Sequence, residues 1–418
     1  VPEDYRNEEF DQLKFHGVAD LHFNNGLRSI DLDLDHFGAK MKVHHQRLEN
    51  FNGRIHYEDD HIMVQNFSGK IGSSDFKTSL NYYLGDDENI KKRDNHFELT
   101  SNRLNFDELF FQETKTSNSS SNTGAATVSE HDAGFNLYEL PFTDMTFDIK
   151  IAHLNYHKYL IDRIDWKLRT TPNHYIYIEK AHLEAADGIW DLKGYFNGSN
   201  PKAIYFSPDI NVQHVDLDKL LLKFDNFGQD HLVSENLHGK LSGKITGKIH
   251  MHKDLVPIID DSEIHIDMEV LNGRLENYAM LEAMADYFAD KNVKKVMFDT
   301  LTNHIDLTQG KLTIPKMSIN SSLGFMEISG SQDLNMNMDY YVSVPWKMVT
   351  QAASSKLFGG KKKEEVDSEQ VDEIQSADPN KRTRFVNIRI QGTPEDYKIT
   401  MKKNRDKASD KLQETRDK

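Results

Sequence analysis

The segment KLSGKITGKIHMH, from Lys240 to His252, decides the fold of this chain. Its odd-numbered positions, from Leu241 to Met251, are apolar or glycine, whereas its even-numbered positions are lysine, serine, threonine or histidine. Strict alternation over this length predicts a β-strand with one face in water and one apolar face. A strand buried in a parallel sheet would instead be apolar at consecutive positions.

The same period of two recurs along the chain. It is clearest from Leu334 to Val344, which we expect to form one long strand, and shorter alternating segments lie at 147–151, 164–168, 264–270, 386–390 and 397–401. A helical period is scarce. An apolar stripe predicts one helix within Leu275–Ala289, and Pro345–Phe358 is a second candidate. These patterns predict a mainly β, antiparallel protein with a few short helices.

An internal repeat organises the strands. Three stretches align without gaps, namely Asp60–Tyr82, His174–Phe196 and Gly310–Gln332. A second landmark, LNFDELF at Leu104–Phe110, matches VDLDKLL at Val215–Leu221. In these two segments Asn105 and Asp216 are expected to cap a short helical turn after a strand. Repeats of strand-rich units favour an elongated, curved array.

Composition excludes several classes of function. The 418 residues include 51 Lys and Arg against 67 Asp and Glu, a net charge of −16, which disfavours nucleic-acid binding. The absence of cysteine excludes disulfides, thiolate zinc sites and cysteine nucleophiles. No nucleophile elbow, phosphate loop or zinc-protease motif occurs, so we expect a protein that is not an enzyme and has no cofactor. No apolar run reaches the roughly 20 residues of a membrane helix.

Two polar patterns could bind a metal, but both have a simpler explanation. His250 and His252 share one face of a strand, and a pair of imidazoles can ligate zinc. No third or fourth ligand is identifiable, which favours a solvated polar face. Asp31, Asp33 and Asp35 alternate with apolar residues, which is the pattern of a half-buried strand rather than of a calcium loop. We therefore assign no metal site.

The apolar strand faces are the main candidate for a binding surface. A second sheet could cover them in a sandwich, or a single curved sheet could hold lipid on its apolar side, and composition does not separate these alternatives. If the sheet forms a groove, eleven side chains are expected to line it: Leu241, Ile245, Ile249, Ile264, Ile266, Met268, Leu334, Met336, Met338, Val386 and Ile388.

The chain resembles the AsmA family of bacterial envelope proteins. The resemblance is carried by the repeat landmarks, by the run from Leu271 to Val344, and by IQGTPEDYKITM at Ile390–Met401, which is similar to the last hairpin of the family. It implies a repeating β-groove related to TamB and to the bridge-like lipid transfer proteins. It also implies the periplasmic portion of a protein attached to the inner membrane through an amino-terminal anchor that this sequence lacks.

The resemblance further implies a function in outer-membrane biogenesis, with phospholipid acyl chains held or transferred in an apolar groove. The alternative is a scaffold or assembly factor for outer-membrane proteins that acts through strand-edge pairing. The expected organisation is a first β-groove repeat (1–112), a disordered loop (113–131), a second repeat (132–235), an AsmA-like carboxyl-terminal repeat with a helix (236–358), a charged linker (359–382), and a final hairpin with a charged tail (383–418).

Overall fold

A computed structural model describes most of the chain. The described residues are 8–24, 26–43, 45–84, 95–110, 137–139, 142–156, 159–223, 235–253, 255–285, 288, 291–346, 372–376 and 384–402. They form twenty strands, three short α-helices and one 3-10 turn. The prediction of a mainly β protein with a few short helices is confirmed. None of the helices in this described part has the length and apolarity to span a bilayer.

The chain divides into two units. The first contains residues 1–185, 190–206 and 251–256, and the second contains residues 186–189, 207–250 and 257–418. Strands β10 (Gly188–Asn197) and β11 (Ile204–Asp216) have residues in both units.

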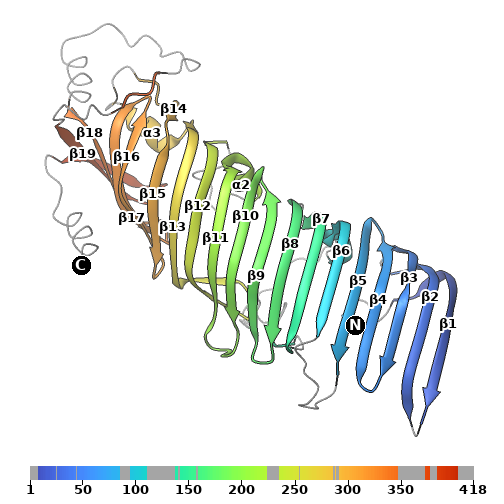
Figure 1. The fold of residues 1–418 in the computed structure, drawn as a ribbon. Helices are drawn as coiled ribbons and strands as arrows, with labels where there is room; N and C mark the ends of the chain where they lie inside the picture. The colour runs from blue at the N-terminus through green and yellow to red at the C-terminus, as the bar shows by residue number, and fades with distance from the viewer. Residues whose placement is uncertain are drawn as a thin grey trace, which may run out of the picture. The chain divides into compact units, whose positions relative to one another are not determined.

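The first unit is an open, curved sheet in which each strand pairs with the next one along the chain (Figure 1). Its strands are β1 (Phe10–Phe23), β2 (Leu27–Met41), β3 (Arg47–Glu58), β4 (His61–Ile71), β5 (Ser74–Tyr83), β6 (His96–Asn105), β7 (Met145–Tyr156), β8 (Tyr159–Thr171) and β9 (Tyr175–Ala185). Helix α1 (Phe106–Phe110) and the 3-10 turn η4 (Leu137–Glu139) lie between β6 and β7 in the sequence. The expected antiparallel pairing holds except between β6 and β7, which are parallel.

The second unit is also built from antiparallel strands. They are β12 (Leu237–Met251), β13 (Pro257–Glu276), β14 (Lys295–Phe298), β15 (Leu301–Thr308), β16 (Lys311–Ser321), β17 (Gly324–Asp333), β18 (Met338–Pro345), β19 (Phe385–Gly392) and β20 (Tyr397–Lys402). Strand β13 is long enough to pair with both β14 and β15, and β15 to β20 then pair in chain order. Helix α2 (Leu217–Lys223) precedes β12, and helix α3 (Ala279–Ala283) follows β13.

The sequence repeat is a repeat of hairpins. Its three aligned stretches form the hairpins β4–β5, β9–β10 and β16–β17, each with a two-residue connection between its strands. The first and third hairpins also share an irregularity, because the ladder shifts between Val64 and Phe67 in one and between Ile314 and Met317 in the other. These positions coincide in the alignment, so the repeat extends to the local bend of the strand.

The two predicted helix caps are confirmed. Asn105 Oδ1 accepts a hydrogen bond from the Glu108 N–H at 3.2 Å, and Asp216 Oδ1 accepts one from the Lys219 N–H at 3.2 Å. Each helix also contacts the turn of a repeat hairpin that precedes it in the chain, β4–β5 for α1 and β9–β10 for α2. The Glu108 carboxylate accepts from the Ser73 N–H at 3.1 Å, whereas Lys219 Nζ lies 2.5 Å from an Asp187 carboxylate oxygen.

The cap at Asp216 is expected to make stability depend on pH. Burial on its own would raise the pKa of Asp216, but hydrogen bonds from Lys240 and the Lys219 N–H outweigh it and hold the pKa below its usual value. A carboxyl group with a lowered folded-state pKa stabilises the fold above its unfolded pKa, and this contribution is lost as the pH falls through the folded pKa. We expect Asp216→Ala to lower the free energy of unfolding by about 1 kcal/mol at pH 7.

The difference between parent and variant should shrink below about pH 4, as measured by urea unfolding at several pH values. Asn105→Ala is the matched control, because it removes the equivalent cap without removing a charge. Its effect should not change with pH. An effect of Asp216→Ala that is equally independent of pH would contradict the expectation.

Two glycines of β12 permit close contact with β13. A Cβ atom at Gly243 would lie 2.3 Å from the Asp267 carbonyl oxygen, and one at Gly247 would lie 2.1 Å from the Glu263 carbonyl oxygen. Gly247 also has a φ of +155°, which side-chain-bearing residues rarely adopt. These two glycines of the segment Lys240–His252 therefore allow the backbones of β12 and β13 to approach each other closely.

The prediction of one strand from Leu334 to Val344 is wrong for its first four residues. Strand β17 ends at Asp333, and β18 begins at Met338. Asp333 Oδ1 accepts a hydrogen bond from the Asn337 N–H at 2.9 Å, and Met336 has a φ of +62°. A local side-chain acceptor thus replaces strand pairing with a turn, although the apolar alternation continues through it.

The helix expected within Leu275–Ala289 is present as α3, but it is shorter than expected, because Leu275 still belongs to β13 and the helix ends at Ala283, before the last residues of the apolar stripe. Three other expectations fall largely outside the described residues. The helix candidate Pro345–Phe358 and the disordered loop expected at 113–131 are two of them. Of the third, 359–382, residues 372–376 are described, and Gln375 forms an isolated β-bridge with Ser321.

Candidate functional site

A continuous row of apolar side chains crosses the sheet of the first unit. Each member is directly opposite the next in the strand register from β2 to β9, so all of them share one face. The row consists of Leu32, Ile55, Val64, Leu80, Phe97, Phe147, Leu168 and Ile178. We call it the apolar row.

The apolar row is only half-buried, because every one of its eight side chains has intermediate exposure. Side chains between the two sheets of a sandwich are close-packed and mostly inaccessible to water. A single sheet with an open apolar side therefore describes this part of the first unit better than a sandwich core.

Aromatic rings extend the apolar face beyond the row. The ring of Phe51 lies 5.9 Å from that of Phe37, 5.9 Å from that of Phe67 and 5.4 Å from that of Phe76, in each case edge to face. These rings come from four neighbouring strands, β2 to β5. Such pairs add a specific geometry to the general gain from apolar contact.

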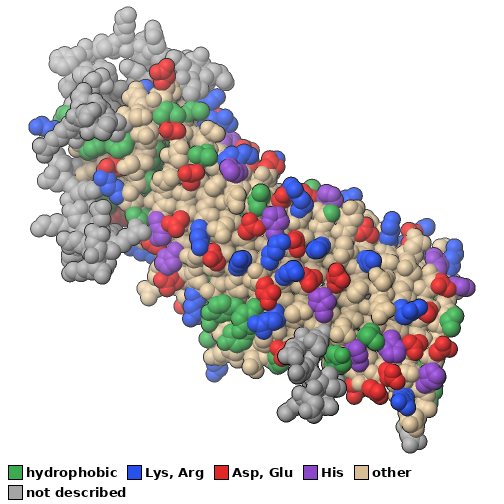
Figure 2. Space-filling model, viewed as in Figure 1, with side chains coloured by type: hydrophobic (Ala, Val, Ile, Leu, Met, Phe, Trp, Pro, Cys, Tyr) green, Lys and Arg blue, Asp and Glu red, His purple; other side chains and the backbone are tan. Residues whose placement is uncertain are grey.

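The opposite face of the sheet is charged. Figure 2 shows basic, acidic and histidine side chains interspersed over the visible surface. The register places oppositely charged residues across neighbouring strands, for example Lys180 beside Asp165 and Lys167 beside Asp148. Mixed charges of this kind suit a surface in contact with water.

The three aspartates of β2 belong to this charged face. Asp31 lies 2.6 Å from His56, Asp33 lies 2.5 Å from Arg54, and Asp35 lies 2.8 Å from His16. Each carboxylate thus has a basic partner on β1 or β3. The three groups form a ladder of cross-strand pairs, as expected for a half-buried strand, and do not converge on a common point.

One part of the apolar face of the first unit is covered. Leu137 of η4 is 1% exposed and packs with Phe196 and Ile204. Partly buried Ile176, two residues before the end of the apolar row on β9, packs against this cluster. The Tyr138 hydroxyl donates a hydrogen bond to the Gly198 carbonyl at 2.5 Å and holds the segment in place.

All eleven candidate groove residues lie in the second unit, in three environments. The six on β12 and β13 are all half-buried: Leu241, Ile245, Ile249, Ile264, Ile266 and Met268. Ile264 lies opposite Leu307 and Ile266 opposite Ile305, so an apolar surface continues from β13 to β15. This part of the second unit resembles the apolar row in its exposure.

The other five candidates lie in the β17–β18 turn or in a packed core. Leu334 is 48% exposed in the β17–β18 turn, and the nearby Met336 is half-buried. In contrast, Met338, Val386 and Ile388 are 4%, 3% and 0% exposed. These three are packed core residues in this structure. Burial in the same region raises the pKa of Tyr340 to about 12.

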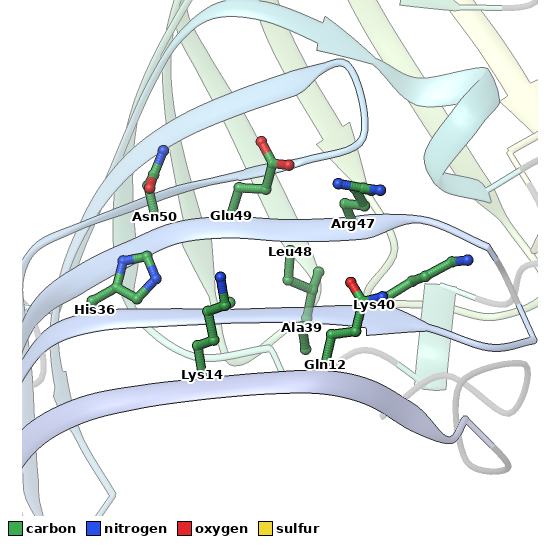
Figure 3. A pocket seen from close by; sticks show the side chains of 10 residues that line it. Gln12, Lys14, His36, Ala39, Lys40, Arg47, Leu48, Glu49 and Asn50 are labelled. Atoms are coloured by element: carbon green, nitrogen blue, oxygen red, sulfur yellow. The ribbon is translucent and has the colours of Figure 1, made fainter.

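A shallow hollow on β1 to β3 was not indicated by the sequence patterns. Figure 3 shows Lys14, His36 and Glu49 projecting from three neighbouring strands at this hollow. Its other lining residues are mainly polar as well. A charged hollow of this kind does not suit an acyl chain, and no motif marks it because its residues are distant in the sequence.

Comparisons with protein families, with curated proteins and with solved structures found no match. The function of the chain is therefore inferred from its own side chains and strand register.

Proposed function

We propose that this chain holds phospholipid acyl chains on the apolar side of its sheet. The observation that carries the proposal is the apolar row, which is continuous over eight strands and half-buried along its whole length. Each methylene removed from water contributes about 0.8 kcal/mol, so an acyl chain gains strongly from such a surface. Binding of this kind needs a continuous apolar lining and no catalytic group.

The resemblance to the AsmA family supports the biological setting of the proposal. In that setting the chain is the periplasmic part of an envelope protein attached to the inner membrane. Its partners are phospholipid and, in outer-membrane biogenesis, the assembly proteins of that membrane. It acts by holding or passing lipid and not as an enzyme.

Mass spectrometry of organic extracts tests the proposal directly. The chain is purified without detergent, extracted, and compared with an unrelated protein of similar size from the same cells. Phospholipid enriched in the extract of this chain is the expected result. An extract without enrichment, together with no uptake of a spin-labelled phospholipid by the purified chain, would reject lipid binding.

One observation favours the alternative function of a strand-pairing scaffold. Strand β1 lies at the outer end of the first unit and pairs with β2 along its length (Figure 1). Thirteen of its fourteen residues are exposed, including Phe15 at 59% and Phe23 at 71%. An exposed edge strand can accept a strand from a partner. Loss of partner binding on insertion of proline into β1, with lipid binding unchanged, would favour this alternative.

A further inference from the structure

Two identical tripeptides face each other on neighbouring strands of the second unit. His-Ile-Asp occurs at 265–267 in β13 and at 304–306 in β15. The strands are antiparallel, and the register places His265 opposite Asp306 and Asp267 opposite His304. The apolar residue between each histidine and aspartate points to the other face of the sheet, so all four polar side chains lie on one face.

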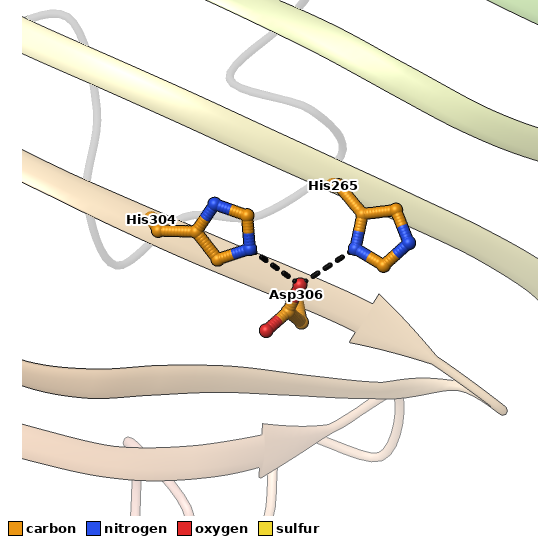
Figure 4. Close-up of side chains that lie close together, drawn as sticks. All are labelled: His265, His304 and Asp306. Atoms are coloured by element: carbon orange, nitrogen blue, oxygen red, sulfur yellow. Dashed lines mark hydrogen bonds and ion pairs between the residues drawn. The ribbon is translucent and has the colours of Figure 1, made fainter. Parts of the chain in front are cut away.

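Two imidazole rings converge on one carboxylate oxygen in this arrangement (Figure 4). His265 Nδ1 lies 2.7 Å and His304 Nε2 lies 2.8 Å from Asp306 Oδ1. All three side chains are partly exposed, with 38% for His265, 26% for His304 and 30% for Asp306. Solvent can therefore reach the point where the three groups meet.

The other ring nitrogen of each histidine also has a carboxylate partner. His304 Nδ1 lies 2.5 Å from Asp267 Oδ1, and His265 Nε2 lies 3.2 Å from Glu263 Oε1. In metal sites, a carboxylate that binds the second nitrogen fixes the ring orientation and makes the first nitrogen a better ligand. Both histidines thus have the outer partner that a ligating imidazole needs.

The cluster differs from the other histidine–aspartate pairs of the sheet. His153 with Asp162 and His182 with Asp191 are single cross-strand pairs, each with an Nδ1–oxygen distance of 2.7 Å. A single pair supplies too few ligands for a stable metal site. Only at Asp306, among the described residues, do two histidines and an aspartate offer ligand atoms within 4.8 Å of one another.

We propose that His265, His304 and Asp306 bind a divalent first-row metal ion, of which zinc is the best suited. Zinc takes imidazole nitrogen and carboxylate oxygen, and three protein ligands leave a position for water. Asp267 and Glu263 act as positioning residues that hold the two rings. The bound ion joins β13 to β15 on the face of these strands that is opposite to Ile266 and Ile305, independently of any lipid on the apolar face.

Titration of the purified full chain with Zn²⁺ against a chromophoric chelator tests the site. One Zn²⁺ should bind more tightly than the background from other histidines. His304→Ala should lower the affinity of this site at least 100-fold, and Asp267→Asn should lower it about 10-fold to 100-fold by removing an outer partner. His182→Ala is the matched control, because it removes one histidine of a single pair, and it should leave the affinity unchanged.

Absorption of the Co²⁺-loaded chain gives a second measurement. Bands typical of four-coordinate Co²⁺ should appear with the parent and with His182→Ala but not with His304→Ala, and circular dichroism should show that both variants keep their strand content. Equal Zn²⁺ affinity in the parent and in His304→Ala would overturn the proposal, as would the absence of any site tighter than the background. Neither result depends on lipid binding.

Discussion

Val64→Asp combined with Phe97→Asp is expected to lower the affinity of the chain for a spin-labelled phospholipid by about 100-fold. The two residues belong to the apolar row and are separated by one strand, so the new carboxylates do not lie directly opposite each other. If each new carboxylate keeps about two methylenes of the acyl chain from contacting the surface, the binding free energy weakens by about 3 kcal/mol. This corresponds to a loss of affinity of about 100-fold.

The fold should survive this change because both positions are half-buried and the new charges can reach water. Gln65→Asp combined with Thr100→Asp is the matched control, since it adds two carboxylates to the same strands at exposed positions. The control should bind lipid like the parent. If the apolar double variant is folded by circular dichroism and keeps its affinity for lipid, the apolar row is not the lipid surface.

Ile388→Ala should lower the free energy of unfolding by about 2–5 kcal/mol, the usual cost of removing a large side chain from a packed core. Ile388 is 0% exposed and lies opposite Val342 on one side and Met401 on the other. Strand β19, which carries Ile388, is paired with β18 on one side and with β20 on the other. These strands can therefore move only partially into the space left by the missing atoms.

Met401→Ala is the comparison for this substitution. Met401 lies directly opposite Ile388 but is 49% exposed, so its truncation should cost less than about 1 kcal/mol. Urea unfolding of the two variants measures the difference. Similar losses for both would show that the carboxyl-terminal strands are not packed as described.

The parts of the fold that depend on neighbouring residues could be predicted from the sequence. The alternation of β12 identified a strand with one apolar face, and Asn105 and Asp216 identified two helix caps. A cap forms between residues three positions apart, and a strand face follows from the pleat alone. Both features therefore leave a signal that a single sequence carries.

Burial, in contrast, depends on strands that are distant in the sequence. Met268 and Met338 have the same alternating pattern around them, yet the first is half-buried and the second is 4% exposed. Alternation shows which face a side chain occupies but not how many other groups pack against it. The same limit applies to Asp306, because only the register of β13 with β15 brings His265 to it. The repeated His-Ile-Asp tripeptide was the one available signal.

The order of the strands has a consequence for how the first unit folds. Each of its strands pairs with the next one along the chain, and most of these pairs are joined by short loops, which close quickly and at little entropic cost. Folding can therefore start in any hairpin and spread to the next strand. The parallel pair β6–β7 is the exception, because His96 pairs with Thr146 across a long connection. Cooperativity should be weakest at this junction, which separates two groups of hairpins that can open at different rates in hydrogen exchange.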